Sequence, residues 1–298
     1  MKTVYFTILA LVLFACGKKP SAQYSDAPQV EAITDPSLFK SVAMVILPSG
    51  SGICTGTFIS PRVVLTAAHC VLSNGLYTVY TTWGMATTTT KVKLGPGVLN
   101  DPLDVAVLIF SSDVAQRSLG QVSYMNSDIH SGERIRIVGY GCNDIDKRTG
   151  ASIKRSGTNV VASVGDYIEL GTPFSTGSGH AINLRPILGP KDQAGSCFGD
   201  SGGPMFRSDS SENGIVGVTH AGGYDSVHII SQYINTGRSE IQSFLHDIDT
   251  DYATGIYDEC NPSDPMNGPP CTSSASLHLF ARLQSFFVKI FSWIASWF

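Results

Sequence analysis

The chain has 298 residues, of which 43% are hydrophobic and 15% are charged, and its formal net charge is −4. This length and apolar content allow one large core or two smaller ones, which excludes disorder as the main state. Without Lys2, Arg282 and Lys289, the only charged residues of 1–15 and 273–298, residues 16–272 carry −7. So acidic a stretch lacks the clustered basic residues that bind phosphates, and nucleic acid is not an expected partner.

The N-terminus predicts export. Lys2 precedes an apolar run over 4–14 that ends in Ala15, which is typical of a secretory signal peptide over 1–15 and too short for a permanent span. Residues 13–16 read Leu-Phe-Ala-Cys and resemble the lipobox of bacterial lipoproteins. That resemblance implies a lipidated Cys16 in a bacterial cell envelope, facing the periplasm or the exterior, with a tether over 16–35. The alternative is an ordinary signal peptide that ends near a cysteine.

Six cysteines remain after Cys16, an even number in an exported chain, where disulfides persist. Two pairs flank short segments and are expected to be local, and the third follows by elimination. The pairs are Cys54 with Cys70, Cys260 with Cys271, and Cys142 with Cys197. Free buried thiols are the alternative.

Short strand-like runs follow one another between about residues 40 and 235, with turn signals such as 73–75, 95–97 and 213–214 between them. The runs are 42–47, 57–60, 63–66, 77–82, 105–110, 134–138, 159–163 and 215–219. This pattern predicts an all-β sandwich or barrel. Only 238–248 predicts a helix, with Ile241, Phe244, Leu245 and Ile248 on one face.

Three motifs carry chemistry. Residues 66–70 read Thr-Ala-Ala-His-Cys, residues 103–107 read Leu-Asp-Val-Ala-Val, and residues 199–204 read Gly-Asp-Ser-Gly-Gly-Pro. A serine hydroxyl becomes a nucleophile when an imidazole takes its proton, and a buried carboxylate orients that imidazole. His69, Asp104 and Ser201 supply these groups. The amides of Gly199 and Ser201 are the natural pair for an oxyanion hole.

The motif around Ser201 also satisfies G-x-S-x-G, the nucleophile elbow of α/β-hydrolases. In that fold the triad partners follow the serine, whereas His69 and Asp104 precede it, and Gly-Gly-Pro starts a helix poorly. An esterase of that fold is therefore excluded. The sequence contains no HExxH, no clustered acidic loop and no paired C-x-x-C, so neither a metal nor a cofactor is expected.

All three motifs, in this order, resemble the chymotrypsin/trypsin family of serine proteases over residues 36–250. The resemblance implies an all-β fold of two antiparallel six-stranded β-barrels with the site in the cleft between them. It further implies a C-terminal helix, a Cys54–Cys70 disulfide and a protein or peptide substrate. Residues 137–141 resemble the family strand that ends near the active site. Cys142 would then lie beside the nucleophile loop, where a link to Cys197 would brace the oxyanion turn.

The specificity pocket departs from the family pattern. The pocket floor is expected at Gly195 and Ser196, and without a carboxylate there we expect no strong preference for Lys or Arg. The wall is expected at Thr219, His220 and Gly222. His220 either orients Asp104, or faces the pocket and favours acidic side chains, or is a wall residue without a role in selectivity.

Activation is the second departure. Family members insert a new N-terminus that pairs with the aspartate before the nucleophile, here Asp200, and the nearest candidate is Ile33, followed by Thr-Asp. Three alternatives stay open. Cleavage occurs after Ala32 at an atypical sequence, the enzyme is held active in another way, or the protein is inactive.

The C-terminal tail extends beyond the family core as a linker over 251–274, with Cys260 and Cys271, and an amphipathic helix over 275–298. An aromatic apolar face beside Arg282 and Lys289 suits a membrane interface, and docking onto the protease domain or a partner is the alternative. The sequence thus predicts an exported serine endopeptidase acting through an acyl-enzyme, with attachment to the membrane by Cys16 and the tail. A catalytically silent, protease-like binding protein is the alternative.

Overall fold

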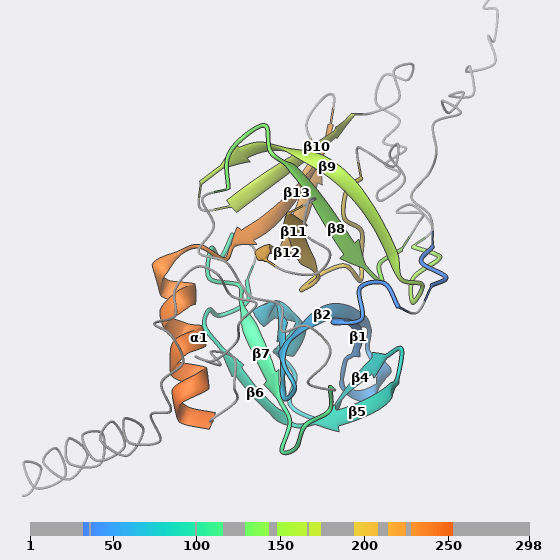
Figure 1. The fold of residues 1–298 in the computed structure, drawn as a ribbon, viewed down its shortest axis with the longest axis vertical. Helices are drawn as coiled ribbons and strands as arrows, with labels where there is room; N and C mark the ends of the chain where they lie inside the picture. Colours follow the sequence, from blue (N-terminus) through green and yellow to red (C-terminus); the bar gives the residue numbers. More distant parts are fainter. Residues whose placement is uncertain are drawn as a thin grey trace, which may run out of the picture.

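The computed structural model describes residues 32–35, 37–98, 100–115, 129–142, 148–165, 167–173, 194–207, 214–224 and 228–252. These residues form two β structures, one above the other in Figure 1, with a helix beside them. Several expected segments lie outside the described residues. They are the expected signal peptide 1–15, Cys16 with most of the expected tether 16–35, almost all of the expected linker 251–274 with Cys260 and Cys271, and the amphipathic helix expected over 275–298.

The first β structure is a seven-stranded antiparallel sheet with the strand order β5-β4-β1-β2-β3-β7-β6. Its strands are β1 (Val42–Ile46), β2 (Ile53–Ser60), β3 (Val63–Thr66), β4 (Tyr77–Thr81), β5 (Gly84–Thr88), β6 (Thr90–Lys93) and β7 (Ala106–Ile109). Two short 3-10 turns, η1 (Pro48–Gly50) and η2 (Ala68–Val71), follow β1 and β3.

Seven strands replace the expected six because one strand is broken at Thr89. Strands β5 and β6 form the two edges of the sheet, yet a single residue separates them in the chain. Thr88 fixes the break, since its Oγ1 donates to the Ile109 carbonyl at 2.6 Å and accepts the Thr90 amide at 3.0 Å. The two edges therefore meet at Thr89 and the sheet curls into a barrel-like structure.

The second β structure is a closed six-stranded barrel with the order β10-β13-β12-β11-β8-β9, as the family resemblance implies. Its strands are β8 (Arg134–Gly139), β9 (Arg155–Val164), β10 (Tyr167–Pro173), β11 (Pro204–Arg207), β12 (Ile215–Tyr224) and β13 (His228–Asn235). The expectation of an all-β fold with two barrels is confirmed. Strands β5, β6, β10, β11 and β13 lie outside the runs that the sequence predicted.

A shared hydrophobic core joins the two barrels. One buried cluster contains Leu65 and Ile109 from the first barrel together with Phe206 and Ile234 from the second. Apolar area removed from water stabilises such a junction by about 25 cal/mol per Å². Because this cluster fixes the barrels against each other, side chains from both can be held in one site.

Helix α1 (Ser239–Tyr252) confirms the predicted C-terminal helix and extends four residues beyond its expected end, reaching into the expected linker. Ile241, Phe244, Leu245 and Ile248 are buried and belong to the shared cluster. This one-sided burial gives the 3.6-residue period that the sequence displays. Within the described residues, no helix combines the length and apolar character needed to cross a bilayer.

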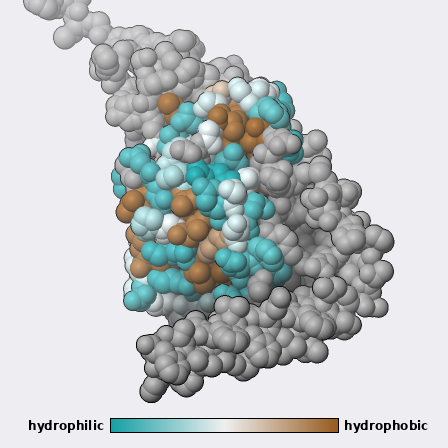
Figure 2. Space-filling view, turned by 90° about the vertical axis from the view of Figure 1, so that its left-hand side faces the viewer, coloured by the Kyte–Doolittle hydropathy of each residue, from teal (hydrophilic) through white to brown (hydrophobic). Residues whose placement is uncertain are grey.

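Figure 2 shows one face of the molecule, on which hydrophobic residues form small groups separated by hydrophilic ones. Scattered apolar residues of this kind are normal on the surfaces of folded proteins. The distribution of hydrophobic residues on this face therefore does not indicate a docking surface.

Candidate active site

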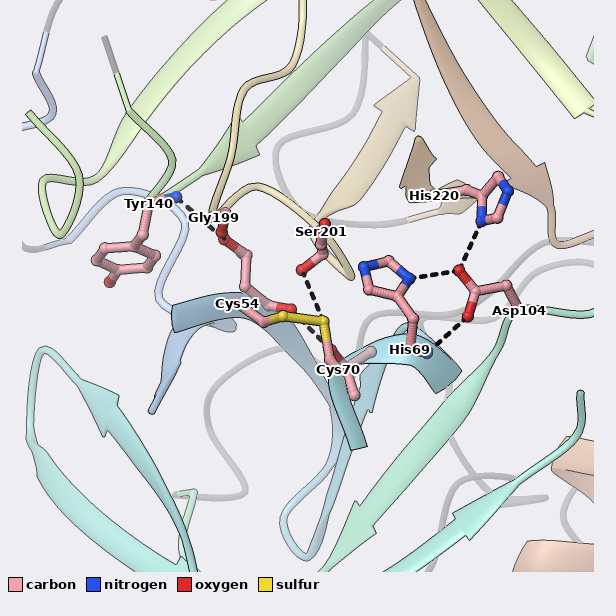
Figure 3. Close-up of a disulfide and its surroundings, with 10 residues drawn as sticks. Cys54, His69, Cys70, Asp104, Tyr140, Gly199, Ser201 and His220 are labelled. Carbon is pink, nitrogen blue, oxygen red and sulfur yellow. Dashed lines mark hydrogen bonds and ion pairs between the residues drawn. A yellow bond between two sulfur atoms is a disulfide. The ribbon is translucent and has the colours of Figure 1, made fainter. Parts of the chain in front are cut away.

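The pairing of β3 with β7 brings His69 and Asp104 together. Thr66, the last residue of β3, lies opposite Ala106, the first of β7. His69 follows β3 in η2, and Asp104 lies just before β7. The amide of His69 donates to Oδ1 of Asp104 at 2.8 Å, and Nδ1 of His69 lies 2.6 Å from Oδ2 (Figure 3).

Asp104 is an ionised carboxylate with no exposed surface. Burial alone would raise its pKa, but hydrogen bonds from His220 and His69 outweigh burial and hold the pKa below its usual value. Because an ionised carboxylate only accepts, Nδ1 of His69 must carry the proton of the 2.6 Å contact. In a neutral imidazole Nε2 is then the basic nitrogen.

Ser201 comes from the second barrel and lies in the turn before β11. Its carbonyl accepts the amide of Thr55 at 2.8 Å, and the next amide, that of Gly202, donates to the Thr219 carbonyl at 2.8 Å. Figure 3 shows the ring nitrogen of His69 that is remote from Asp104 facing Ser201. The three residues of the expected triad thus meet at the junction of the barrels.

The turn around Ser201 needs glycine at two positions. Gly199 has φ +99° and Gly202 has φ +80°, a region that side chains disfavour. A Cβ at Gly202 would lie 2.1 Å from Oγ1 of Thr66 and 2.5 Å from the Thr55 carbonyl. Within the described part of the chain, the amides of Gly199 and Ser201 donate to no protein acceptor, so both are available to a ligand.

Thr55 is a site residue that the sequence analysis missed. Its Oγ1 donates to the Gly199 carbonyl at 2.8 Å and accepts the Tyr140 amide at 3.1 Å. Together with its amide bond to Ser201, these contacts hold the turn from β2 of the other barrel. Its position next to Cys54 was the one signal available, since a threonine in a strand is otherwise ordinary.

Asp200 is buried directly beneath this turn. Its Oδ1 accepts the amide of Gly141 at 2.7 Å, and its Oδ2 accepts the amide of Cys197 at 2.8 Å. A Cβ at Gly139 or Gly141 would lie 2.0 or 2.4 Å from atoms of Asp200, so both positions require glycine. Burial raises the pKa of Asp200 to about 7, against the two amides and the positive charge of Arg155, which lower it.

Both disulfides that fall within the described residues are formed. Cys54 and Cys70 bracket His69, and Cys142 is linked to Cys197. Sγ of Cys70 also lies 3.7 Å from the Ser201 carbonyl, a contact rather than a hydrogen bond because a disulfide sulfur has no proton. The second disulfide joins the segment after β8 to the turn that carries Gly199 and Ser201, where bracing was expected.

The expected floor and wall residues adjoin the nucleophile turn. The amide of Ser196, next to the buried Gly195, donates to Oγ of Ser231 at 2.9 Å. Thr219 donates from its amide and its Oγ1 to the Gly203 carbonyl, at 2.8 and 2.9 Å. Gly222 is exposed further along β12. Ser231, buried in β13, is a second residue that the sequence did not indicate.

His220 lies against Asp104. Its Nδ1 is 2.6 Å from Oδ2 of Asp104, its side chain is 3% exposed, and its ring stacks on Tyr167 at 5.3 Å between centroids. Of the three alternatives for His220, this geometry favours the orientation of Asp104. Because Nδ1 of His220 is bonded to the Asp104 carboxylate, this nitrogen does not face the pocket to select acidic side chains.

Ile33, the expected new N-terminus, is bound to the start of β9. Its amide donates to the Lys154 carbonyl at 2.8 Å, and Ala32 pairs with Arg155 as an isolated bridge. Ile33 also packs against the shared core. In this chain the amides of Gly141 and Cys197 supply the hydrogen bonds of the Asp200 carboxylate.

Among the residues that the structure describes, two groups of side chains have metal-ligand chemistry. Cys54, His69 and Cys70 form one, but both cysteines are in a disulfide and offer no thiolate. His69, Asp104 and His220 form the other. Their nitrogens lie 2.6 Å from one carboxylate oxygen, whereas ligands around a tetrahedral zinc stand about 3.3 Å apart. The spacing is that of hydrogen bonds.

The fold matches solved structures of chymotrypsin-like serine proteases. Residues 34–237 match the family model described as Trypsin, so the chain belongs to the trypsin family.

The similar solved structures share little sequence with this chain. A Glu endopeptidase in complex with MPD is 19% identical, with a TM-score of 0.54 over 76% of this chain and 97% of that one. The human heparin binding protein is 16% identical, with a TM-score of 0.55 over 80% and 98%. Neuropsin, a serine protease expressed in the limbic system of mouse brain, is 16% identical, with a TM-score of 0.51 over 72% and 98%. At these identities the likeness shows the fold.

Proposed function

We propose that the protein is an exported serine endopeptidase that cleaves peptide bonds through an acyl-enzyme. The observation that carries this proposal is the double hydrogen bond between His69 and a fully buried Asp104, with the second ring nitrogen facing Ser201 (Figure 3). This arrangement leaves a basic nitrogen beside a hydroxyl, which activates a nucleophile.

In the proposed mechanism, Oγ of Ser201 attacks the peptide carbonyl while Nε2 of His69 takes the hydroxyl proton. Asp104 holds the ring through Nδ1 and stabilises the imidazolium that forms. The amides of Gly199 and Ser201 donate to the oxyanion. His69 then gives the proton to the leaving amine, and water, deprotonated by the same nitrogen, hydrolyses the acyl-enzyme.

We expect the proposed pocket to show no strong preference for the positively charged side chains of Lys and Arg. Gly195 and Ser196 place no carboxylate at the expected floor, and the nearby Asp200 is buried and satisfied by main-chain amides. Trypsin-like preference for Lys or Arg depends on such a carboxylate. A peptide-library cleavage profile tests this, and dominant cleavage after Lys or Arg would contradict it.

A binding protein of the same fold is the second candidate, because one of the similar structures is that of a protein named for binding heparin. A polyanion such as heparin would be repelled by a chain whose net charge is −4. The intact His69–Asp104 pair also favours catalysis over a silent scaffold.

A fluorophosphonate probe separates the two candidates. The wild-type protein is expected to be labelled, and Ser201→Ala is expected to lose the label, while Ser131→Ala, a serine just before β8 and outside the site, keeps it. Absence of label on the wild type, before and after limited proteolysis, would favour the binding protein.

We further infer that the protein is anchored in a bacterial envelope by a lipid on Cys16, with the helix 275–298 at the membrane interface. The signal-like N-terminus and the basic, aromatic tail support this. Intact mass of the wild type against Cys16→Ser tests lipidation. Vesicle flotation of the non-lipidated Cys16→Ser protein, with and without truncation before Asn261, tests the tail, and unchanged flotation after truncation would remove its role.

A further inference from the structure

A buried arginine lies behind the nucleophile turn. The side chain of Arg155, the first residue of β9, donates from Nη1 to the carbonyls of Gly141, Gly150 and Ile153, at 3.1, 2.7 and 3.2 Å. The residue is 6% exposed. An uncompensated cation at such depth costs several kcal/mol in desolvation, so a negative counterpart nearby would stabilise it.

That counterpart is Asp200. Arg155 and Asp200 line the same small cavity inside the second barrel, together with Ser196, Thr219 and Tyr233. The positive charge of Arg155 acts on the Asp200 carboxylate and lowers its pKa against the effect of burial. The charge therefore favours the ionised form of Asp200, which accepts both main-chain hydrogen bonds.

One peptide group connects the two side chains. The carbonyl of Gly141 accepts Nη1 of Arg155, while the amide of Gly141 donates to Oδ1 of Asp200. Arg155 thus holds the Gly141 peptide group, whose amide in turn holds the Asp200 carboxylate. A chain of hydrogen bonds that ends on charged groups at both ends is stronger than its separate neutral members.

The position of Asp200 determines the shape of the turn. Its carboxylate accepts the Cys197 amide, its own amide donates back to the Cys197 carbonyl at 3.0 Å, and its carbonyl accepts the Gly203 amide at 2.8 Å. Gly199 and Ser201 are its immediate neighbours. Any movement of Asp200 would therefore displace the two amides that the proposed oxyanion hole uses.

We propose that Arg155 is the positioning residue that holds the turn 197–203 in a competent geometry in the uncut chain, so that no new N-terminal amine is needed. The inference rests on the proposed peptidase function. The uncut segment supports it, because Ala32 pairs with Arg155 and Ile33 bonds to Lys154 at the start of β9. A cut there would remove two contacts beside Arg155 rather than complete the site.

The test uses the full chain with its N-terminal segment intact, verified by intact mass, and measures the rate of fluorophosphonate labelling. The uncut wild type is expected to react, with no gain after limited proteolysis. Arg155→Gln is expected to react about 100-fold more slowly, the scale for a displaced reacting group, and Arg155→Lys to recover part of the loss. The control is Arg134→Gln, which removes the same charge from an exposed position on β8.

The pH profile separates positioning from damage to the fold. Within the described residues, the ionisable groups that act electrostatically on Asp200 are Arg155 from β9 and Tyr233 from β13. Loss of the arginine charge raises the pKa of Asp200, so the acid limb of labelling should move to higher pH in Arg155→Gln, while Arg134→Gln leaves it unchanged. A variant that merely unfolds would lower the melting temperature without moving that limb.

Each result then decides one claim. Labelling that appears only after a cut creates a new N-terminus would overturn the role of Arg155 and leave the peptidase function standing. A folded Arg155→Gln variant that is labelled at the wild-type rate, with an unmoved acid limb, would also overturn the role of Arg155 and leave the peptidase function standing. No labelling of any form would refute the peptidase function itself, and the inference with it.

Discussion

The imidazole of His220 donates from Nδ1 to Oδ2 of Asp104 at 2.6 Å. The same oxygen accepts Nδ1 of His69 at the same distance. Two imidazoles from different barrels thus hold one buried carboxylate, which fixes its rotamer and keeps it charged. Tyr167, stacked on His220, holds the second imidazole in turn.

His220→Phe should lower kcat/KM for a peptide substrate by about 10- to 100-fold, because a hydrogen bond to a charged group contributes about 1.5–3 kcal/mol. The hydrogen bond from His220 lowers the pKa of Asp104. Its loss raises that pKa, so activity, which needs the carboxylate, should fall at a higher pH on the acid side. Rate–pH profiles against His130→Gln, an exposed histidine outside the site, check both effects. An unmoved acid limb with full activity would contradict the orienting role.

Thr55→Val should reduce kcat about 10-fold and lower the free energy of unfolding by about 2 kcal/mol, because it removes two hydrogen bonds at roughly 1 kcal/mol each. Those bonds join Thr55 to Gly199 and Tyr140. Thr57→Val is the matched control. It lies on the same strand, 1% exposed, and its hydroxyl has no partner within the described structure. Equal effects of the two substitutions on kcat would show that Thr55 does not position the turn.

The double variant Cys142→Ala/Cys197→Ala should lose about 2–4 kcal/mol of unfolding free energy, the range for removal of a disulfide. The two cysteines are 55 residues apart and lie beside the nucleophile turn. We expect kcat to fall as well, since the turn that carries Gly199 loses one of its attachments. Urea unfolding and steady-state kinetics measure both quantities. An unchanged midpoint and kcat would mean that the main-chain bonds around Asp200 suffice.

The stability of the protein should depend on pH through Asp200. Its pKa in the fold is about 7, against 3.8 when unfolded. Between these values the folded chain binds more protons than the unfolded chain, so stability falls as pH rises, by up to about 4 kcal/mol. Asp104, with its lowered pKa, acts in the opposite sense, and its contribution is lost on acidification below the usual range.

The comparison of wild type with Asp200→Asn isolates this effect. The stability of the wild type relative to the variant should decline between about pH 4.5 and 8. At low pH the protonated carboxyl group of Asp200 is neutral, like the amide of the variant. As the pH rises, the wild-type group loses its proton and becomes a buried charge. Asp247→Asn, on the exposed face of α1, is the control substitution. A difference that rises with pH would reverse the sign and refute the effect of burial on Asp200.

The sequence by itself predicted the chemistry and determined the general architecture. The motifs around His69, Asp104 and Ser201 indicated a serine nucleophile activated by an imidazole and a carboxylate, because few other arrangements need those residues in that order. Alternating apolar runs predicted strands, and the period of Ile241, Phe244, Leu245 and Ile248 predicted α1. Such patterns are local, so they can be read without knowledge of long-range contacts.

Only the tertiary structure decided what surrounds that chemistry. Four features depend on contacts between distant parts of the chain. They are the strand break at Thr89, the hydrogen bond from Thr55 to Gly199, the hydrogen bond between His220 and Asp104, and the burial of Arg155 behind Asp200. The local sequence does not predict these contacts, since threonine, histidine and arginine are common in strands and loops. Closure of the barrels and their shared core bring these groups together, and burial then gives each contact its strength.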